Sequence, residues 1–316
     1  MQINRNKSLE DIFAENDLLQ NNLQRKQEEA EAALFAAHPK LQAWETEKKH
    51  IIAASLQEMS KSPQQREAIK QAALQAREVV EAKIIEYRKK NNLSPVVQEV
   101  SCQLCHGRGR TETGDLCICI KERMYEEVFG GQRTEALEGS FVAYEIQRAG
   151  VGEEQRLKMQ ARKALLLEYA ANFPENEKKQ LLFLGEAGLG KSFAMGALLK
   201  EIQKKERDIC YISAARLFSY FHKVRLGEAE LTQPLYQVKV LVIDDLGSEP
   251  MTQNVTREVL FELLEERKKA GRYTFFITNH GLAQLKERYT ERVFSRLLSR
   301  QDSLVIPFEG KDLRLL

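Results

Sequence analysis

Apolar and polar residues recur with two different periods along this chain. In the first third, apolar residues return every three or four positions, which is the spacing of an amphipathic helix. The clearest stripe consists of Ile69, Ala73, Ala76, Val80, Ile84 and Tyr87. From about Phe141 onward, short runs of apolar, β-type residues alternate with helical stretches. The pattern predicts an all-helical N-terminal region followed by an α/β region.

Three long helices are predicted within the first hundred residues. Their pattern breaks at Pro39 and again at Ser62 and Pro63, because proline does not continue a preceding helix. Ser62 is expected to cap the third helix, with Pro63 at its first position and Gln65 reaching back to the N–H group of the cap. That helix is expected to end near Asn91.

The helical region has two interpretations. It is a plain helical bundle, or it is a hairpin whose apolar stripe completes a bundle with a partner protein. Trp44, the only tryptophan, is part of the core in the first case and an anchor for the partner in the second.

Four strands are predicted in the second region, each a run of apolar or β-branched residues. They are Leu181–Leu184, Ile209–Ile212, Val240–Ile243 and Tyr273–Ile277. Their alternation with helical stretches favours a parallel sheet flanked by helices. All 17 glycines lie at or after Gly107, which puts a boundary between the two regions near residue 100.

Composition and charge exclude several classes of protein. With 316 residues, 43% of them apolar and 30% charged, the chain resembles an ordinary soluble protein of two or three units. No apolar run approaches the roughly 18 residues of a membrane span, and the N-terminus lacks a hydrophobic signal core. We therefore expect a cytoplasmic protein without membrane contact. Forty-eight basic residues nearly balance 46 acidic ones, so any nucleic-acid contact must be local.

Residues 185–192 read Gly-Glu-Ala-Gly-Leu-Gly-Lys-Ser, the pattern of a phosphate-binding loop. They follow a predicted strand and open a helix, which is the context that the motif requires. Backbone N–H groups would surround the phosphates, Lys191 would reach the β- and γ-phosphates, and Ser192 would bind Mg²⁺. The predicted contacts with ATP are Gly185, Glu186, Ala187, Gly188, Leu189, Gly190, Lys191, Ser192 and Phe193.

A second motif supplies acids at the end of a strand. Val240–Ile243 runs into Asp244 and Asp245, a Walker B pattern. Asp244 would hold Mg²⁺, and Asp245 would orient or deprotonate the attacking water. Because aspartate is one methylene shorter than the glutamate of many ATPases, we expect slow, switch-like ATP hydrolysis. The alternative is a strand that merely ends in two solvated acids.

The last predicted strand runs into Asn279, and a later helix carries Arg292 and Arg296. Taken singly, each would be an ordinary solvated residue. As an ordered set they resemble sensor 1 (Asn279) and the arginine-finger box (Arg296, or else Arg292) of the AAA+ ATPases. The resemblance implies an AAA+ parallel sheet and self-association through this module, because the finger acts on a neighbouring subunit.

The resemblance narrows to the DnaC/DnaI/IstB branch, which contains bacterial helicase loaders and transposition helper ATPases. It is carried, in order, by Asp244-Asp245-Leu246-Gly247-Ser248-Glu249, Thr278-Asn279, Glu291–Leu297 and Gly310-Lys311-Asp312-Leu313-Arg314. It covers about Leu137 to Leu316 and implies that Arg314 is a second nucleotide sensor. Since the chain ends two residues later, no C-terminal lid domain or helix-turn-helix is expected.

Four of the five cysteines crowd into one short segment. Their spacing supplies four thiolates, enough for one tetrahedral Zn²⁺, at Cys102, Cys105, Cys117 and Cys119. Free thiols or an iron–sulfur cluster are the alternatives, and His106 is an alternative ligand. Cys210 lies in an apolar strand and is expected to be an inert buried thiol.

The predicted helix around Arg216–Arg225 interleaves aromatic and basic residues. In the loaders that this chain resembles, the corresponding region contributes to binding of single-stranded DNA. One face of the helix is apolar and core-like. Tyr220, Lys223 and Arg225 are expected to lie off that face, where they would stack on bases or meet phosphates.

Together these features predict an AAA+ helicase loader in three parts. Residues 1–100 would bind the hexameric replicative helicase, residues 101–136 would form a zinc knuckle and linker, and residues 137–316 would be an AAA+ ATPase that contacts single-stranded DNA. Zinc-bearing N-terminal domains are a feature of DnaI-like loaders, whereas IstB-like helpers usually lack them. The nearest alternative is a transposition helper ATPase. An ATP-gated adaptor without a DNA role is the alternative from another class.

Overall fold

The computed structural model of the chain describes residues 7–94, 99–132, 137–142, 144, 150–229, 232–251 and 255–315. From the sequence, no hydrophobic signal core is expected in the N-terminal stretch. Residues 1–6, which make up most of that stretch, lie outside the described ranges. By internal contacts the chain divides into a sheet unit, Met1–Phe13 with Arg110–Leu316, and a helical unit, Ala14–Gly109. The three-part division at residues 100 and 136 stays a prediction. Within the ranges above, every helix is too short or too polar to cross a lipid bilayer.

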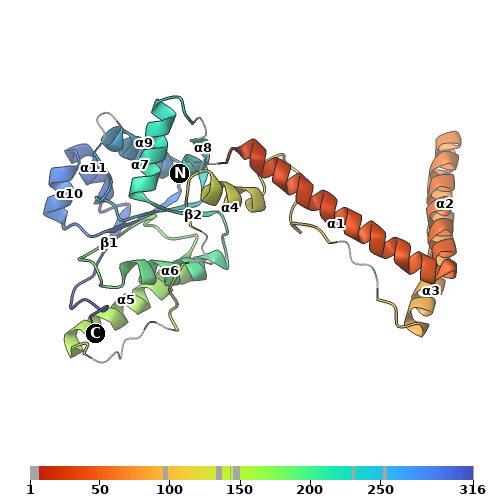
Figure 1. The fold of residues 1–316 in the computed structure, drawn as a ribbon, viewed down its shortest axis with the longest axis horizontal. Coiled ribbons are helices and arrows are strands. Elements are labelled where there is room, and N and C mark those ends of the chain that lie inside the picture. The colour runs from red at the N-terminus through yellow and green to blue at the C-terminus, as the bar shows by residue number, and fades with distance from the viewer. Residues whose placement is uncertain are drawn as a thin grey trace, which may run out of the picture. The chain divides into compact units, whose positions relative to one another are not determined.

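The N-terminal region is all-helical, as predicted. Its elements are α1 (Leu9–Ala37), α2 (Pro39–Lys61), the 3-10 turn η1 (Pro63–Gln65) and α3 (Arg66–Lys90). α2 and α3 lie side by side (Figure 1). Leu41, Val80 and Ile84 form their small buried core, and the rings of Trp44 and Tyr87 pack against it edge to face, with centroids 5.5 Å apart.

The predicted cap of the third helix is wrong. Ser62 precedes η1 rather than α3, and its side chain makes no capping hydrogen bond. Gln65 instead donates its backbone N–H to the Ser62 carbonyl at 3.0 Å, and α3 begins after it. Along the chain, a 3-10 turn therefore precedes α3, and its backbone hydrogen bond joins residues that are three positions apart. Of the predicted apolar stripe, Ala76 is exposed.

A five-stranded parallel sheet occupies the centre of the sheet unit, in the order β2-β3-β4-β1-β5. The four predicted strands are confirmed as β1 (Gln180–Leu184), β2 (Ile209–Ser213), β3 (Val240–Asp244) and β4 (Tyr273–Thr278). β5 (Ser303–Pro307) was not predicted. It lies at the sheet edge, where exposed positions interrupt the continuous apolar run that marks a central parallel strand.

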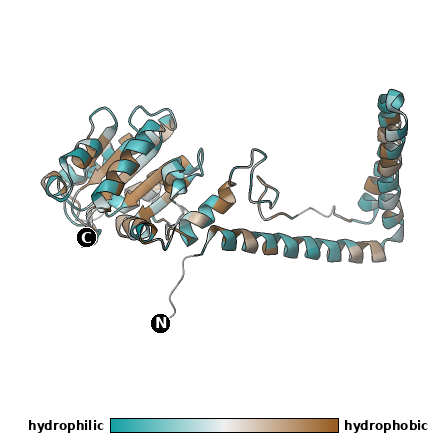
Figure 2. Ribbon diagram, turned by 90° about the horizontal axis from the view of Figure 1, so that it is seen from above, coloured by the Kyte–Doolittle hydropathy of each residue, from teal (hydrophilic) through white to brown (hydrophobic). Residues whose placement is uncertain are grey.

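Helices cover both faces of the sheet (Figure 1). One face packs against α5 (Glu153–Asn172) and α6 (Lys191–Gln203). The other packs against α4 (Ile118–Glu127), α7 (Ala214–Arg225), α8 (Gln233–Gln237), α9 (Thr256–Lys269), α10 (Leu282–Arg288) and α11 (Glu291–Leu297). The strands between them are the most apolar part of the unit (Figure 2). The helix-covered parallel sheet confirms the predicted α/β architecture.

Arg267 joins α9 to α8 and β4. Its side chain is fully buried at the end of α9. It donates to Thr274 Oγ1 at 2.9 Å and to the main-chain carbonyls of Leu235, Tyr236, Val238 and Tyr273. Burial lowers the pKa of the guanidinium, and the ring of acceptors compensates for its lost hydration.

Candidate nucleotide-binding site

The predicted phosphate loop connects β1 to the first turn of α6. Gly188 and Gly190 have left-handed backbone angles, with φ of 80° and 81°. A side chain at Gly188 would collide with the carboxylate of Asp312. Gly190 caps α6 directly, so the free N–H groups of that helix open toward the loop. This combination of turn and helix N-terminus is suited to binding phosphate.

Lys191 is the polar centre of the site. Its side chain is only 5% exposed. Nζ donates to the carbonyls of Gly185 (2.7 Å) and Glu186 (2.6 Å) and to Oδ1 of Asn279 (2.7 Å). Burial lowers the pKa of Lys191, and the nearby carboxylates of Asp244 and Asp245 oppose that shift. A buried cation at the start of a helix favours an anionic ligand.

Asp244 lies at the end of β3 beside the first turn of α6. The Tyr211 hydroxyl donates to its Oδ2, and the Asp245 N–H donates to its Oδ1 at 2.8 Å. Ser192 Oγ lies 3.5 Å from the same Oδ2. Burial raises the pKa of Asp244. One carboxylate and one hydroxyl, with room for water and phosphate oxygens, fit the octahedral oxygen ligation of Mg²⁺.

Asp245 and Asn279 meet across neighbouring strand ends. Asp245 has a left-handed backbone with φ of 58°, a conformation that aspartate and asparagine tolerate better than most residues. Its Oδ1 accepts from Nδ2 of Asn279 at 2.7 Å. Asn279 therefore bridges Lys191 and Asp245, and Asp245 is placed as a candidate to orient a water near the phosphates.

A cavity of about 790 Å³ joins these groups. Its lining includes Ala187, Gly188, Gly190, Lys191, Ser192, Phe193, Asp244, Asp245, Asn279 and Arg314. Gly185 and Glu186 offer carbonyls to Lys191, and Leu189 is buried, with 7% exposure. The structure thus brings together loop, acids, amide and C-terminal arginine in one place.

Sequence reasoning missed part of this lining. Glu138, Tyr144 and Met159 belong to no nucleotide motif, and the sequence carried no signal for them. The C-terminal segment reaches the cavity because the side-chain amide of Gln155 pairs with the backbone of Lys311, at 3.0 and 3.1 Å. Leu313 N–H then donates to the Gly188 carbonyl at 2.9 Å, within the phosphate loop itself.

The family model described as IstB-like ATP binding protein matches residues 155–314, which cover the site just described. The chain belongs to this family. ATP is therefore the nucleotide for which the cavity is built, and the phosphate loop, Lys191 and Arg314 all lie within the matched residues.

Two curated relatives and one solved structure resemble this IstB-like protein. The replicative helicase loader DnaI of Bacillus subtilis (strain 168) is 29% identical over 149 residues, which are 46% of this chain and 47% of the relative. Protein y4pL of Sinorhizobium fredii (strain NBRC 101917 / NGR234), named for an insertion sequence and ATP binding, is 33% identical over 102 residues, 31% and 40% of the two chains. The alignments thus span about half or less of each relative. A crystal structure of the DnaC helicase loader has 24% identity and a TM-score of 0.43, and covers 52% of this chain and 98% of its own.

The arginine box of this IstB-like protein lies on α11. Nε of Arg296 forms an ion pair with Oε1 of Glu265, and its side chain is 41% exposed. The guanidinium of Arg292 stacks over the Phe261 ring at 4.3 Å. Among the described residues, neither arginine lines the cavity of its own chain.

One predicted DNA contact is wrong. Tyr220 does not lie off the apolar face of α7, because it is 5% exposed and belongs to the main core. Its ring meets that of Phe129 edge to face, with centroids 4.8 Å apart. Lys223 is half-buried and Arg225 is exposed, so these two remain predicted phosphate contacts. Cys210 is buried, as expected, and burial raises its pKa to about 12.

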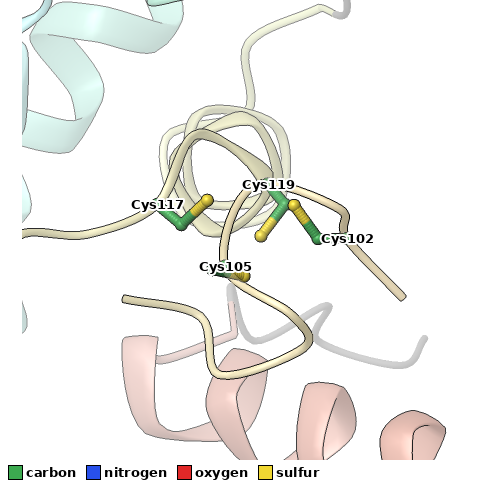
Figure 3. Close-up of side chains that lie close together, drawn as sticks. All are labelled: Cys102, Cys105, Cys117 and Cys119. Atoms are coloured by element: carbon green, nitrogen blue, oxygen red, sulfur yellow. The ribbon is translucent and has the colours of Figure 1, made fainter. Parts of the chain in front are cut away.

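The four clustered cysteines of this IstB-like protein converge on one point (Figure 3). The sulfur atoms of Cys102, Cys105, Cys117 and Cys119 all lie within 4.8 Å of one another. Tetrahedral Zn²⁺ at 2.3 Å from each sulfur would separate them by roughly 3.8 Å, so the arrangement is compatible with zinc. The Gly109 N–H donates to Cys105 Sγ at 3.2 Å, a bond suited to a thiolate. His106 is exposed and is not one of the clustered ligands.

Replacing the buried lysine tests the phosphate loop. Lys191→Ala should weaken ATP binding by about a hundredfold, because it removes charge-assisted hydrogen bonds to phosphate. Isothermal titration calorimetry measures the affinity, and circular dichroism checks the fold. Lys200→Ala, further along the same helix, is the matched control and should bind ATP normally. Unaltered ATP affinity in folded Lys191→Ala would refute the assignment.

The cysteine cluster makes a second prediction. Purified, freshly reduced protein should carry one Zn²⁺ per chain, measured by inductively coupled plasma mass spectrometry. Cys102→Ser combined with Cys105→Ser should lose the metal and still bind ATP, because the phosphate loop is separate from these residues. Protein that contains no zinc, or that shows an iron chromophore, contradicts this assignment.

Proposed function

We propose that this protein is an ATP-dependent loader of a hexameric replicative DNA helicase. In this proposal, the helical unit binds the helicase, and the sheet unit binds ATP and single-stranded DNA. The similarity to the DnaI loader supports the role. The cysteine cluster supports it further, since four cysteines placed to hold zinc resemble the zinc-bearing N-terminal domains of DnaI-like loaders.

The surface of the helical unit is the observation that carries the proposal. Among the described residues, the buried core between α2 and α3 consists of three apolar side chains. Large apolar side chains nevertheless remain exposed along α2 and α3, among them Leu56 (61%), Leu74 (47%), Val79 (58%) and Ile85 (59%). Helices that expose so many apolar side chains are suited to packing against helices of a partner.

The residues that line the cavity support the proposed Mg²⁺–ATP chemistry. Ser192 and Asp244 would hold Mg²⁺, which neutralises charge on the phosphates when it is bound. Asp245, oriented by Asn279, would position water for attack and accept its proton. The shorter reach of aspartate accounts for the slow, switch-like hydrolysis that we propose.

Complex formation with a helicase tests the proposed role. Full-length protein is mixed with candidate hexameric helicases and sized by light scattering, with ATP and without nucleotide. Leu56→Ser combined with Val79→Ser should abolish the complex and leave ATP affinity unchanged. Leu157→Ser, an equally exposed leucine (60%) on α5, is the control and should still bind. If no replicative helicase associates with the wild-type protein, the proposal is wrong.

Transposition helper activity is the second candidate function, because the family match and the similarity to y4pL favour it. An ATP-dependent complex with a transposase in place of a helicase would identify it. Lys223 and Arg225 are the proposed DNA contacts in either case. If single-stranded DNA leaves ATP affinity unchanged, an adaptor without a DNA role is the better description.

Arg296 is proposed to act on ATP bound by a neighbouring subunit. Arg296→Ala should therefore keep its ATP affinity and lose ATPase activity, by roughly a thousandfold for an arginine finger. Phosphate release measures the rate. Arg292→Ala should matter less, because that guanidinium stacks more closely over Phe261, at 4.3 Å against 5.8 Å for Arg296.

Mixing two inactive variants sharpens this test. Asp245→Asn preserves a side chain that tolerates the left-handed backbone and still accepts from Asn279. Mixed with Arg296→Ala, it should restore activity at interfaces that pair an intact Asp245 with an intact Arg296. Variants that co-assemble and stay inactive, or an Arg296→Ala protein with normal activity, would exclude action in trans.

A further inference from the structure

A tyrosine of the edge strand β2 contacts one of the acids of the nucleotide site. Tyr211 lies on β2, next to β3 in the sheet, and its side chain is 4% exposed. Its hydroxyl donates to Oδ2 of Asp244, the oxygen that Ser192 also approaches. Tyr211 belongs to none of the motifs that mark the site in the sequence.

The bond completes the orientation of the Asp244 carboxylate. The other oxygen, Oδ1, accepts the backbone N–H of Asp245 at 2.8 Å. With donors at both oxygens, the carboxylate plane cannot rotate freely. Outer donors of this kind orient metal-binding carboxylates and contribute to the affinity for the metal.

The position of Tyr211 is itself fixed from outside the sheet. Gln132 donates its backbone N–H to the Tyr211 carbonyl at 2.7 Å, which adds a bridge at the open edge of β2. Just before the same strand, Asp208 accepts from Lys121 Nζ (2.8 Å) and Tyr125 Oη (2.6 Å) of α4. The Gln132 bridge therefore fixes the backbone of β2 at Tyr211 itself, so the tyrosine presents its hydroxyl at a defined position. Lys121 holds Asp208 whether or not the Tyr125 hydroxyl is present.

We propose that Tyr211 is a positioning residue for the Mg²⁺ site: its hydroxyl holds Asp244 in the orientation that binds the metal together with ATP. This inference rests on the Mg²⁺–ATP chemistry proposed above. Tyr211 is not one of the residues that line the cavity, and in this proposal it acts through Asp244. A buried tyrosine hydroxyl needs some acceptor, and Tyr125, whose acceptor Asp208 lies away from the cavity, shows the purely structural case.

The test separates metal binding from nucleotide binding. Affinity for a fluorescent ATP analogue is measured in EDTA and then over a Mg²⁺ titration, for wild type, Tyr211→Phe and Tyr125→Phe. Tyr211→Phe should bind the analogue normally in EDTA and need about tenfold more Mg²⁺ for half of the metal-dependent response. Tyr125→Phe loses a matched buried hydroxyl–carboxylate bond and should titrate like wild type. Mn²⁺ binding, measured by electron paramagnetic resonance, should likewise be weaker in Tyr211→Phe than in wild type and Tyr125→Phe.

Each other outcome overturns a defined statement. An unchanged Mg²⁺ midpoint in Tyr211→Phe refutes the positioning role alone, as does an equal shift in Tyr125→Phe, which would reflect general loosening of β2. Loss of binding in EDTA by Tyr211→Phe also refutes it, because the tyrosine would then support the whole cavity. If wild type binds the analogue without any response to Mg²⁺, the proposed metal chemistry is wrong and the inference falls with it.

Discussion

The arrangement of the nucleotide site depends on the buried ammonium group of Lys191. A cation that is 5% exposed needs oxygen partners, and it finds them at Gly185, Glu186 and Asn279. These partners come from the ends of two strands. They meet because β1 and β4 pair in parallel, with Leu184 opposite Thr278. Hydrogen bonds through Lys191 thus join the phosphate loop and the Asn279 amide into one unit.

The acidic side of the site depends on the same strand ends. After β3 the chain turns at Asp245, and Leu246 returns to β4: its N–H donates to the Ile277 carbonyl at 2.8 Å, and its carbonyl accepts from Thr278 Oγ1 at 2.6 Å. This fold-back places the Asp245 carboxylate against Asn279. Parallel strands direct their carboxyl ends to one edge, which is why ligands of such sheets bind there.

The stability of the helical unit has a different origin. Its helices bury few side chains, so their stability owes more to local propensity and to packing between α2 and α3 than to a large core. The helix periodicity predicted all three helices, whereas the expected cap at Ser62 failed because a backbone turn replaced it. Exposed apolar side chains on such a unit are suited to packing against another protein.

The sequence by itself determined the phosphate loop, the Walker B strand, the strands β1 to β4 and the cysteine cluster, because each depends on neighbouring residues or on a short spacing. Tertiary structure alone decided which distant groups meet. Strand order brings Tyr211 to Asp244, Gln155 anchors the segment that carries Arg314, and Phe129 covers Tyr220, which had been expected to face DNA. The edge strand β5 also emerged only in the fold. Hydrophobic periodicity gives the face of an element but not its neighbour, so partners far apart in the chain are settled by packing and by the cost of burying unpaired polar groups.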